Sequence, residues 1–382
     1  MYVGGVGLTK VDEHWERTLT ELMAEAGLSA LESAGLQSVD AVVVSNVFAE
    51  SLQEQVNLGA YFAEVLGLRG VSCLRVEAGG ASGLAAVYSA ASSIVSGLNK
   101  AVLVVGAEKM SDATAEEAVA LSSMEEPAEY IASLGVSQLA EAALIYKEYL
   151  IRYGLEQEDV AYFPVLGHEH AQTAPHAQYQ FKISVDTVMN SPYVAEPLRR
   201  FDTTSPADGA AAVLLLSEEL ARKLDSPKAV LKGFGMASDY LSPFDREDPV
   251  EMRSINFAAQ RALEMAGLSR GSIDFVEVHD SYSFMAPLSL EAMGFAEKGY
   301  ACHDARKGRW SLSGETPLNT FGGLKGRGNP VGASNIYSLA EAYLQVTGNA
   351  EKNQVDGAKA GLIQAVAGLG SYAAAVIIEE VG

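Results

Sequence analysis

Cysteine, positive charge and long apolar runs are all scarce in this sequence, and each shortage excludes a class of protein. The two cysteines, Cys73 and Cys302, cannot form a disulfide framework, and neither has the Cys-x-x-Cys spacing of a zinc site. No segment reaches the roughly 18 uninterrupted apolar residues that could cross a bilayer. The 27 basic residues against 49 acidic ones give a net charge of −22, which argues against nucleic acid as the main partner.

The remaining composition is that of a folded protein with about two domains. The chain has 382 residues, of which 48% are hydrophobic and 20% charged, and a chain of this length exceeds one ordinary core. Its first residues lack a basic region followed by an apolar core, so we expect no signal peptide and a cytoplasmic protein. Because the chain is acidic overall, we expect any anionic ligand to be held by local basic residues or by backbone N–H groups.

The most informative stretch is the glycine-rich turn Val76 to Gly83, Val-Glu-Ala-Gly-Gly-Ala-Ser-Gly, which we call the first elbow. It joins an apolar strand, Cys73 to Val76, to a helical run, Leu84 to Leu98. Glycines at such a turn let the backbone approach a ligand closely and leave the first N–H groups of the helix free for an oxygen anion. Enzymes often place a nucleophile on such an elbow, but Gly79 and Gly80 offer no side chain.

Strands and helices alternate through the first part of the chain. Short runs of β-branched and apolar residues predict buried strands, and apolar residues at helical spacing predict helices between them. This alternation predicts an α/β protein with a parallel sheet and helices on both faces. After an apolar segment at 2–8, the predicted strands are 39–46, 73–76, 101–106 and 209–216, and the predicted helices are 13–34, 52–66 and 84–98.

Two internal echoes indicate that the chain is duplicated. Ala30 to Leu36 reads Ala-Leu-Glu-Ser-Ala-Gly-Leu and Ala262 to Leu268 reads Ala-Leu-Glu-Met-Ala-Gly-Leu, so six of seven positions are identical. Each copy is followed by an aspartate and an apolar strand, as expected of a repeated unit of structure. Gly80-Ala81-Ser82 is likewise echoed by Gly332-Ala333-Ser334. The sequence therefore predicts two similar α/β halves, with a ligand site where their strand ends and elbows meet.

The two predicted halves are residues 1–225 and residues 226–382, and the first contains an insertion. Residues 111–200 carry acidic patches, tyrosines and histidines, and the stretch Gly167 to Phe181 has no clear periodicity. We interpret 111–200 as helices and loops that cover the edge of the sheet, because such excursions commonly build substrate tunnels.

Three further stretches are candidates for chemistry. His279 directly follows an apolar strand of the second half, where a histidine can polarise a carbonyl or move a proton, or else tie down a loop. A second elbow, Phe321 to Ser334, carries Lys325 and Arg327; it is either a loop that lines a phosphate or thioester or a tight solvated turn. The turn Ala367 to Gly370 lies between two apolar strands, and it can present N–H groups to an oxyanion or be a plain hairpin.

Five motifs, in order along the chain, resemble those of the thiolase superfamily, and of its archaeal and sterol-carrier-protein-type members in particular. They are Glu77 to Gly83, Gly106 to Met110, Ser205 to Ala211, His279 to Tyr282 and Gly322 to Gly332. The resemblance runs from about residue 2 to about residue 380. It implies the thiolase fold, with two duplicated α/β halves in a five-layer αβαβα arrangement. It also implies a homodimer across the edge strands of the first halves and an acyl-coenzyme A ligand.

Two catalytic positions of that family do not match this chain. Thiolases similar to it carry Cys-Ala-Ser-Gly on the first elbow, where the cysteine takes the acyl group, and Gly80 stands there instead. They carry Gly-His-Pro on the second elbow, where the histidine activates that cysteine, whereas Asn329 cannot act as a general base near neutral pH. His279 matches an archaeal His-Asp motif whose ring helps to bind the thioester oxygen. The resemblance thus implies an oxyanion hole of His279 and the N–H groups of Gly80 and Gly370, without a covalent acyl carrier.

Neither cysteine is expected to replace the missing nucleophile. Cys73 lies seven residues before Gly80, about 20 Å away at about 3.3 Å per extended residue, and Cys302 falls in a loop of unknown position. Histidines at i and i+2, such as His168 and His170, diverge on a strand or a helix, so no metal site is expected. Tyr282 and Tyr337 are the other polar side chains expected near the site. Contacts with coenzyme A are expected from Lys325, Arg327, Gly328, Ser82 and, in the insertion, His168.

These observations leave three hypotheses for the function. The first is an enzyme that makes or breaks a carbon–carbon bond of an acyl-CoA without an acyl-enzyme, as an aldol or retro-aldol reaction permits. Thiolase-like aldolases resemble this chain in having glycine on the first elbow, although their usual tyrosines correspond to His279 and Asn329 here. The second is a non-catalytic acyl-CoA-binding or scaffold subunit. The third is acetyl-CoA acetyltransferase activity, which overall likeness suggests and the missing cysteine disfavours.

The same resemblance implies a protein partner. Archaeal thiolases of this type, and the aldolases, work with a small zinc-ribbon and OB-fold protein of the DUF35 type that carries the coenzyme. An acidic surface suits a basic partner. We expect the coenzyme A thioester to be a substrate or ligand and no cofactor to be tightly bound.

Overall fold

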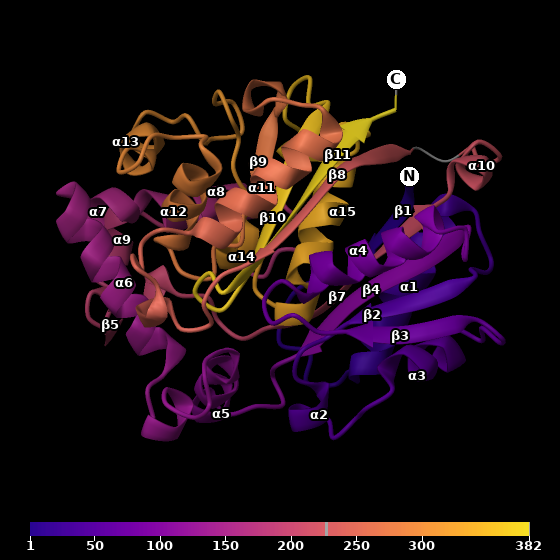
Figure 1. The fold of residues 1–382 in the computed structure, drawn as a ribbon, viewed down its shortest axis with the longest axis horizontal. Coiled ribbons are helices and arrows are strands. Elements are labelled where there is room, and N and C mark those ends of the chain that lie inside the picture. Colours follow the sequence, from indigo (N-terminus) through magenta and orange to yellow (C-terminus); the bar gives the residue numbers. More distant parts are fainter. Residues whose placement is uncertain (226–227, 382) are drawn as a thin grey trace.

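One continuous sheet of nine strands runs through the molecule (Figure 1). The computed structural model describes residues 1–225 and 228–381, and all statements about the structure refer to these residues. The order across the sheet is β3, β2, β4, β7, β1, β8, β11, β10 and β9. The strands are β1 Tyr2–Leu8, β2 Ala41–Ser45, β3 Ser72–Val76, β4 Ala101–Lys109, β7 Asp208–Leu216, β8 Ala229–Ser238, β9 Phe275–Glu277, β10 Ala360–Ala367 and β11 Tyr372–Glu380; a small hairpin pairs β5 Tyr193–Ala195 with β6 Leu198–Arg199.

The sheet is mixed, whereas the alternation of strands and helices predicted a parallel one. Strands β3, β2 and β4 are parallel to one another, as are β10 and β9. Strand β7 is antiparallel to β4, with Lys109 opposite Asp208. The chain leaves β4 and enters β7 at the same end of the sheet, because the long segment between them returns to where it started, and parallel pairing would require a crossover to the other end.

Helices cover both faces of the sheet and also fill the space between its two halves. The bounds of the longer helices are α1 Leu19–Ala34, α3 Leu58–Val65, α4 Ser82–Val95, α6 Gln138–Tyr153, α8 Tyr162–Ala171, α11 Arg253–Ala266, α12 Met285–Met293 and α15 Ser334–Val346. The shorter helices are α2 Ala49–Leu52, α5 Ala115–Ser122, α7 Gln157–Val160, α9 Val185–Met189, α10 Glu218–Ala221, α13 Ala301–Arg306 and α14 Gly323–Gly326.

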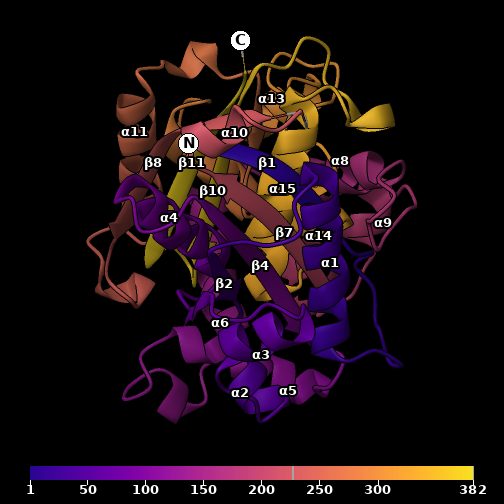
Figure 2. The same ribbon diagram turned by 90° about the vertical axis from the view of Figure 1, so that its right-hand side faces the viewer.

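The layers follow the predicted five-layer order. Helix α1 packs on β1, β4 and β7, and α11 packs on β8 and β11, so these helices form the two outer layers. Helices α4 and α15 lie in the middle, because each contacts strands of both halves. The two halves are joined where Tyr2 and Val3 of β1 pair with Val230 and Ala229 of β8. Figure 2, seen from the side of the first half, shows β1, β7, β4 and β2 running side by side.

The two halves pack an outer helix on a strand in the same way, as the duplication predicted from the sequence implies. In each half, two glycines on a strand let the backbone carbonyls of the outer helix approach closely, at positions that no side chain could share. A Cβ atom built on these glycines would lie between 1.9 and 2.4 Å from a helix carbonyl oxygen. The pairs are Gly5 with Ala30 and Gly7 with Ala26 in the first half, and Gly233 with Ala262 and Gly235 with Ala258 in the second.

The echoed Gly-Ala-Ser motifs also match in structure, because α4 begins at Ser82 and α15 begins at Ser334. The predicted division of the chain between residues 225 and 226 involves residue 226, which lies outside the described residues. That exact boundary stays a prediction.

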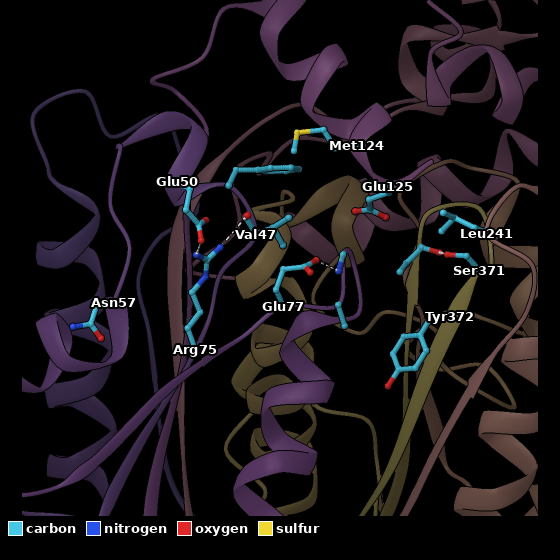
Figure 3. Close-up of a pocket in the computed structure, with 14 residues that line it drawn as sticks. Val47, Glu50, Asn57, Arg75, Glu77, Met124, Glu125, Leu241, Ser371 and Tyr372 are labelled. Carbon is cyan, nitrogen blue, oxygen red and sulfur yellow. Dashed lines mark hydrogen bonds and ion pairs between the residues drawn. The ribbon is translucent and has the colours of Figure 1, made fainter. Parts of the chain in front are cut away.

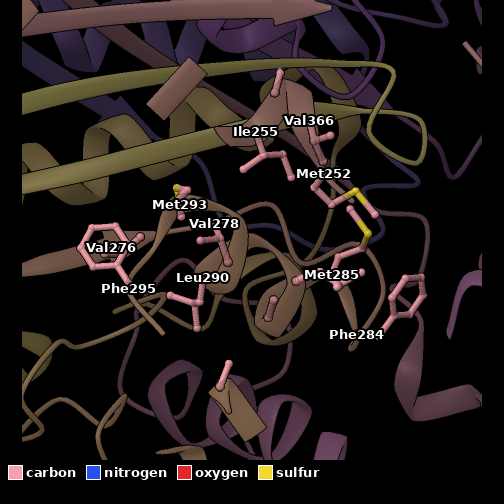
Figure 4. Packing of buried hydrophobic residues seen from close by; sticks show 14 of the residues in the cluster. Met252, Ile255, Val276, Val278, Phe284, Met285, Leu290, Met293, Phe295 and Val366 are labelled. Carbon is pink, nitrogen blue, oxygen red and sulfur yellow. The ribbon is translucent and has the colours of Figure 1, made fainter. Parts of the chain in front are cut away.

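The insertion packs on the second half of the molecule. Tyr146 and Tyr149 of α6 are fully buried in the same apolar core as α11 and α12, and the Tyr146 ring stacks on Phe284 at 5.3 Å between centroids. Figure 4 shows part of this core, where Val276 and Val278 lie among the methionines of α12. The insertion therefore contributes to the core of the other half.

Two predicted helices have different bounds in the structure. The first helix begins at Leu19 and not at Glu13, because Thr18 and Glu21 form a capping box at its start. The helix predicted at 52–66 is two helices, α2 and α3, because Asn57 adopts a left-handed conformation with φ of 58° between them. No helix among the described residues is long and apolar enough to span a membrane.

The close contact between β8 and α11 predicts that Gly235→Ala destabilises the protein. The new methyl group would lie 1.9 Å from the carbonyl oxygen of Ala258, so the helix has to move away from the sheet. We expect a loss of about 1–3 kcal/mol or more in the free energy of unfolding, measured by urea denaturation. Gly271→Ala is the matched control, because its nearest neighbour would be 3.9 Å away. Equal stabilities of the two variants would contradict the proposed constraint.

Candidate active site

The first elbow is held in shape by Ser82. Its hydroxyl donates a hydrogen bond to the Gly79 carbonyl at 2.6 Å and accepts one from the Ala78 N–H at 2.8 Å. The side chain is fully buried. Ser82 was expected to contact coenzyme A, but its hydrogen-bonding groups are used within the elbow, so its observed role is structural.

Gly80 has no room for a side chain. A Cβ atom there would lie 2.5 Å from the Val366 carbonyl oxygen at the end of β10 and 3.1 Å from Cε1 of the His279 ring. Real Cβ atoms do not approach a backbone oxygen so closely, so any larger residue would push the two halves apart here. The structure thus brings together Gly80, His279 and the end of β10, as the duplication suggested.

His279 is buried beside Gly80 and is neutral. Burial, with the Arg327 charge adding to it, lowers the pKa of the His279 imidazole to about 3. Its Nδ1 lies 3.4 Å from the Asn335 side-chain nitrogen, and its backbone N–H donates to Gln364 at 3.0 Å. If Asn335 donates to Nδ1, then Nε2 carries the proton and faces the elbow, 3.3 Å from the Cβ position of Gly80. A neutral imidazole in this tautomer can donate one hydrogen bond to a substrate oxygen.

Glu125, a glutamate that the sequence did not single out, contacts the elbow at Gly79, next to Gly80. Glu125 ends a short 3₁₀ turn, Ser123–Glu125, in the insertion. Its carboxylate accepts a hydrogen bond from the Gly368 N–H and also interacts with the Gly80 N–H. A Cβ atom on Gly79 would lie 2.9 Å from the same carboxylate. Burial raises the pKa of Glu125 to about 7, and the nearby Glu77 raises it further against the lowering effect of the two N–H groups.

Two more buried carboxyl groups lie next to Glu125. Both oxygens of Glu126 and of Glu141 are without a hydrogen-bond partner among the described residues. Burial and the neighbouring acids raise the pKa of Glu126 to about 8, and burial raises that of Glu141 to about 7. Arg246 is the cation of this group, but its guanidinium donates to the carbonyls of Leu369 and Tyr240.

A cavity of about 760 Å³ opens over this elbow. Its wall includes Gly79, Glu77 and Glu125 together with apolar side chains such as Met124 and Leu241, whereas Gly80 and His279 do not line it (Figure 3). Arg75 forms an ion pair with Glu50 at the other side of the cavity and donates to two backbone carbonyls. The cavity is therefore partly apolar, with its acidic groups concentrated at the elbow.

The basic residues of the second elbow point into the protein. Arg327 is fully buried and donates to Glu341 at 2.8 Å and to the Ser334 carbonyl at 3.1 Å. Lys325 donates to the Thr203 carbonyl at 2.5 Å, and burial lowers the pKa of its ammonium group to about 8. The expectation that these two residues hold a phosphate is therefore corrected, because both positive charges have partners inside the fold. The interpretation as a loop open to solvent fails for the same reason.

Two other expected site residues, Gly328 and Asn329, serve the second elbow itself. Gly328 has φ of 108°, and a Cβ atom there would lie 2.5 Å from Val11, so the position needs glycine for packing. Asn329 donates to Thr204 at 3.2 Å and accepts from Ser334 at 2.7 Å. These contacts occupy its amide within the loop, so the structure shows an anchoring role for Asn329 and for Gly328.

The expected tyrosines are apart from the reacting groups. The Tyr337 hydroxyl is buried against Thr9, with 3.0 Å between its oxygen and the Thr9 carbonyl oxygen. The Tyr282 hydroxyl donates to Gln138 at 3.2 Å, and burial together with Glu125, Glu126 and Glu141 raises its pKa. Tyr282 thus belongs to the surroundings of the acidic groups, whereas Tyr337 supports the sheet.

The oxyanion donor predicted at the final turn, Gly370, lies two positions after the glycine whose N–H faces the elbow. The Gly370 N–H donates to the Ala367 carbonyl at 3.2 Å, so it is used inside the turn. The Gly368 N–H is the one that faces the first elbow, and it holds Glu125. Both glycines have positive φ, 53° at Gly368 and 102° at Gly370, so the direction of each N–H depends on turn geometry that the sequence alone does not give.

The histidines of the insertion are engaged in the core. His168 is buried among the rings of Tyr179, Phe181 and Phe201, and burial lowers the pKa of its imidazole to about 4. It is therefore not at the surface, where contact with coenzyme A was expected. His176 pairs with Glu341 at 2.7 Å. Among the described residues no group of three metal-binding side chains could hold a metal ion.

Neither cysteine lies at the elbow contacts or in the wall of the cavity. Cys302 is fully buried in α13, with its sulfur 3.9 Å from the Tyr149 hydroxyl, and burial raises the pKa of its thiol to about 12. Cys73 is half-buried on β3. A thiol with so high a pKa is a poor nucleophile.

The fold is thus a duplicated α/β fold whose elbows and strand ends gather backbone N–H groups, a neutral histidine and an acid. Such groups are able to donate hydrogen bonds to a carbonyl oxygen. Models of two protein families match the chain, "Thiolase, N-terminal domain" over residues 8–219 and "Thiolase C-terminal domain-like" over residues 235–380. The chain belongs to the thiolase superfamily, and the predicted thiolase fold is confirmed.

Individual relatives agree with this assignment. The chain is 37% identical to an acetyl-CoA acetyltransferase of Methanothermobacter thermautotrophicus, over 98% of both chains. It is 31% identical to human sterol carrier protein 2, over 95% of this chain and 69% of that protein. Among solved structures, the Ltp2-ChsH2(DUF35) aldolase has a TM-score of 0.86 with 24% identity, over 99% of this chain and 97% of that one, and so shares the fold.

The unpartnered acids predict a pH-dependent stability. The folded state keeps a proton on Glu126 up to a pKa of about 8, whereas its ordinary value is 4.5. Stability is thus lost as the pH rises from about 4.5 to about 8, because the unfolded chain releases this proton first. We expect Glu126→Gln to be about 1–3 kcal/mol more stable than the wild type at pH 8 and nearly equal at pH 4.5. Urea denaturation at both pH values measures this.

Glu129→Gln is the control for that experiment, because Glu129 is exposed on the same segment. It should leave the pH dependence as it is in the wild type. A Glu126→Gln variant with the wild-type dependence on pH would show that the Glu126 carboxyl is not held protonated.

Proposed function

We propose that this protein makes or breaks a carbon–carbon bond in an acyl-CoA, by an aldol or retro-aldol reaction without a covalent acyl-enzyme. The observation that carries the proposal is the filled space at Gly80. The thiolases that this chain resembles hold their acyl group on a cysteine at this position. Here the residue is glycine, and the Val366 carbonyl lies 2.5 Å from where a Cβ atom would be. The packing of the two halves thus opposes a nucleophilic side chain here.

Stabilisation of the thioester oxygen remains available without such a nucleophile. The His279 imidazole is neutral, buried and directed at the elbow, so its Nε2–H can donate to the carbonyl oxygen of a thioester. Cleavage of the bond between Cα and Cβ leaves negative charge on this oxygen as an enolate. A donor held in a dry site stabilises that charge more than water does, since it needs no reorganisation.

The coenzyme portion of the ligand requires a partner protein to bind it. Lys325 and Arg327 are committed inside the fold. The wall of the cavity carries three glutamates, Glu50, Glu77 and Glu125, and Arg75, which also lines it, is paired with Glu50. Such a wall repels the phosphates of coenzyme A. We therefore propose that a DUF35-type protein with a zinc ribbon and an OB fold holds the coenzyme. The shared fold with the Ltp2-ChsH2(DUF35) aldolase supports this.

We also propose a homodimer through the edge of the first half. Strand β3 is the outermost strand on that side, and an unpaired edge invites pairing with another chain. Leu74 on β3 is 44% exposed, and Val95 of the adjacent α4 is 79% exposed. The expected cytoplasmic location remains a prediction.

Two other functions are kept as alternatives. A non-catalytic acyl-CoA-binding subunit would retain the fold and the cavity and have no turnover. The second alternative is acetyl-CoA acetyltransferase activity, after which the relative at 37% identity is named. This reaction requires a residue that carries the acyl group. The buried Cys302 thiol is a poor candidate for that residue, because burial raises its pKa.

The test is to incubate the chain, with and without a DUF35-type partner, with β-hydroxyacyl-CoA thioesters and with acetyl-CoA. We expect an acyl-CoA and a carbonyl compound to be released from the β-hydroxyacyl-CoA, and intact-protein mass spectrometry to show no acyl adduct. His279→Ala should reduce turnover by about 10²–10³-fold, the usual cost of one oxyanion donor. His303→Ala, on an exposed helix position, is the matched control.

Each alternative has its own result in this assay. Coenzyme A binding without any turnover would favour the scaffold subunit and overturn the proposed reaction. An acyl adduct on Cys302, together with formation of acetoacetyl-CoA, would restore the acetyltransferase reading.

A further inference from the structure

Glu125 lies in the wall of the cavity and contacts the first elbow from a segment outside it, whereas Glu77, which also lines the cavity, belongs to the elbow and accepts from the Gly79 N–H. The Glu125 carboxylate lies against Gly79, whereas the His279 ring lies against Gly80, the next residue. A neutral imidazole and a carboxyl group thus contact two adjacent glycines of the elbow. Of these two, Glu125 faces the cavity (Figure 3).

The backbone groups that hold Glu125 are of the kind that stabilise an oxyanion. The Gly368 N–H donates to the carboxylate, and the Gly80 N–H interacts with it. In a protein that forms no acyl-enzyme, these donors have no tetrahedral intermediate to bind. They are free to fix a carboxylate at the elbow, which leaves the thioester oxygen to His279.

Within the described part of the chain, Glu125 is not held in place by an ion pair, because the charged groups that act on it are acids. Its acidic neighbours are Glu77 and Glu126, and no ion pair joins it to a basic residue among the described residues. Arg246, which acts on the adjacent Glu126, donates to two backbone carbonyls and pairs with Asp239. A carboxyl group buried without a cation is costly to the fold, and such groups gather where proton transfer is needed. The opposing effects of burial, acids and N–H groups place the pKa of Glu125 at about 7, where a residue can both take and return a proton.

We propose that Glu125 is the residue that moves the proton in the carbon–carbon bond step, and that the Gly368 and Gly80 N–H groups hold it in place for this task. This inference rests on the proposed function.

The step balances with Glu125 alone. In the retro-aldol direction the Glu125 carboxylate takes the proton of the β-hydroxyl group, the oxygen lone pair forms the C=O bond, and the bond between Cα and Cβ breaks. Its electron pair forms the enolate of the shortened thioester, whose oxygen accepts from His279. The protonated Glu125 then gives its proton to Cα. One carbonyl compound and one acyl-CoA result, and no further reactant is consumed.

The enolate half of this cycle can be measured without knowing the natural substrate. Acetyl-CoA in deuterium oxide exchanges its methyl hydrogens if the protein removes and returns a proton at Cα, and mass spectrometry counts the deuterium. With the DUF35-type partner present, we expect the wild-type chain to catalyse this exchange and Glu125→Gln to lower its rate by about 10²–10⁴-fold, with no loss in the midpoint of thermal unfolding. Glu125→Asp retains the carboxylate and should recover part of the rate.

Glu116→Gln is the matched control, because Glu116 is an exposed acid on α5 of the same segment. It should exchange at the wild-type rate. The outcomes separate the two claims. If Glu125→Gln exchanges hydrogen for deuterium at the wild-type rate, the role of Glu125 is overturned and the proposed function still stands. Absence of exchange and of bond cleavage in the wild type would overturn both. If Glu125→Gln fails to fold, Glu125→Ala takes its place, and exchange at the wild-type rate in Glu125→Ala would overturn the inference.

Discussion

The contact between Gly80 and the Val366 carbonyl is the constraint on which the site depends. It brings the first elbow of one half against the end of β10 from the other half, at a distance that leaves no space for a side chain. The His279 ring lies 3.1 Å from the Cβ position of Gly80, and the Glu125 carboxylate lies 2.9 Å from that of the adjacent Gly79. A side chain at Gly80 would have to displace backbone, which is far more costly than moving another side chain.

The surroundings of this contact favour proton transfer over acyl transfer. The site has no thiol, its histidine is held neutral by burial, and its acids have pKa values raised to about 7 and 8. Buried carboxyl groups without cations oppose folding at high pH, so they are expected only where they serve the reaction. The cavity above them is acidic on one side and apolar on the other, which suits an acyl group better than the phosphates of its coenzyme.

Much of the fold follows from the sequence, because its signals are local and repeated. The match between residues 30–36 and 262–268 identified the two outer helices, and the structure repeats their close glycine contacts with β1 and β8. The glycines of Val76 to Gly83 identified the elbow, and the position of His279 after a strand brought it there. The direction of β7 was missed, because strand direction depends on where a long insertion returns to the sheet.

The site was less predictable than the fold. Arg327 and Lys325 carry charges that suggest an anion site, but their partners, such as Glu341, are distant in sequence and visible only in three dimensions. Glu125 lies in an aperiodic insertion, where nothing in Met124-Glu125-Glu126 distinguishes it from a solvated acidic turn. Its role emerges only because residues 125 and 368, far apart in the chain, meet at the elbow.

The most direct measurement is a crystal structure of the protein with a stable β-hydroxyacyl-CoA analogue bound. We predict that no covalent bond joins the ligand to the protein. The thioester oxygen should lie within about 3 Å of His279 Nε2, and the β-hydroxyl group should lie at a similar distance from the Glu125 carboxylate. A thioester carbonyl bound away from His279, or an acyl group attached to the protein, would contradict this prediction.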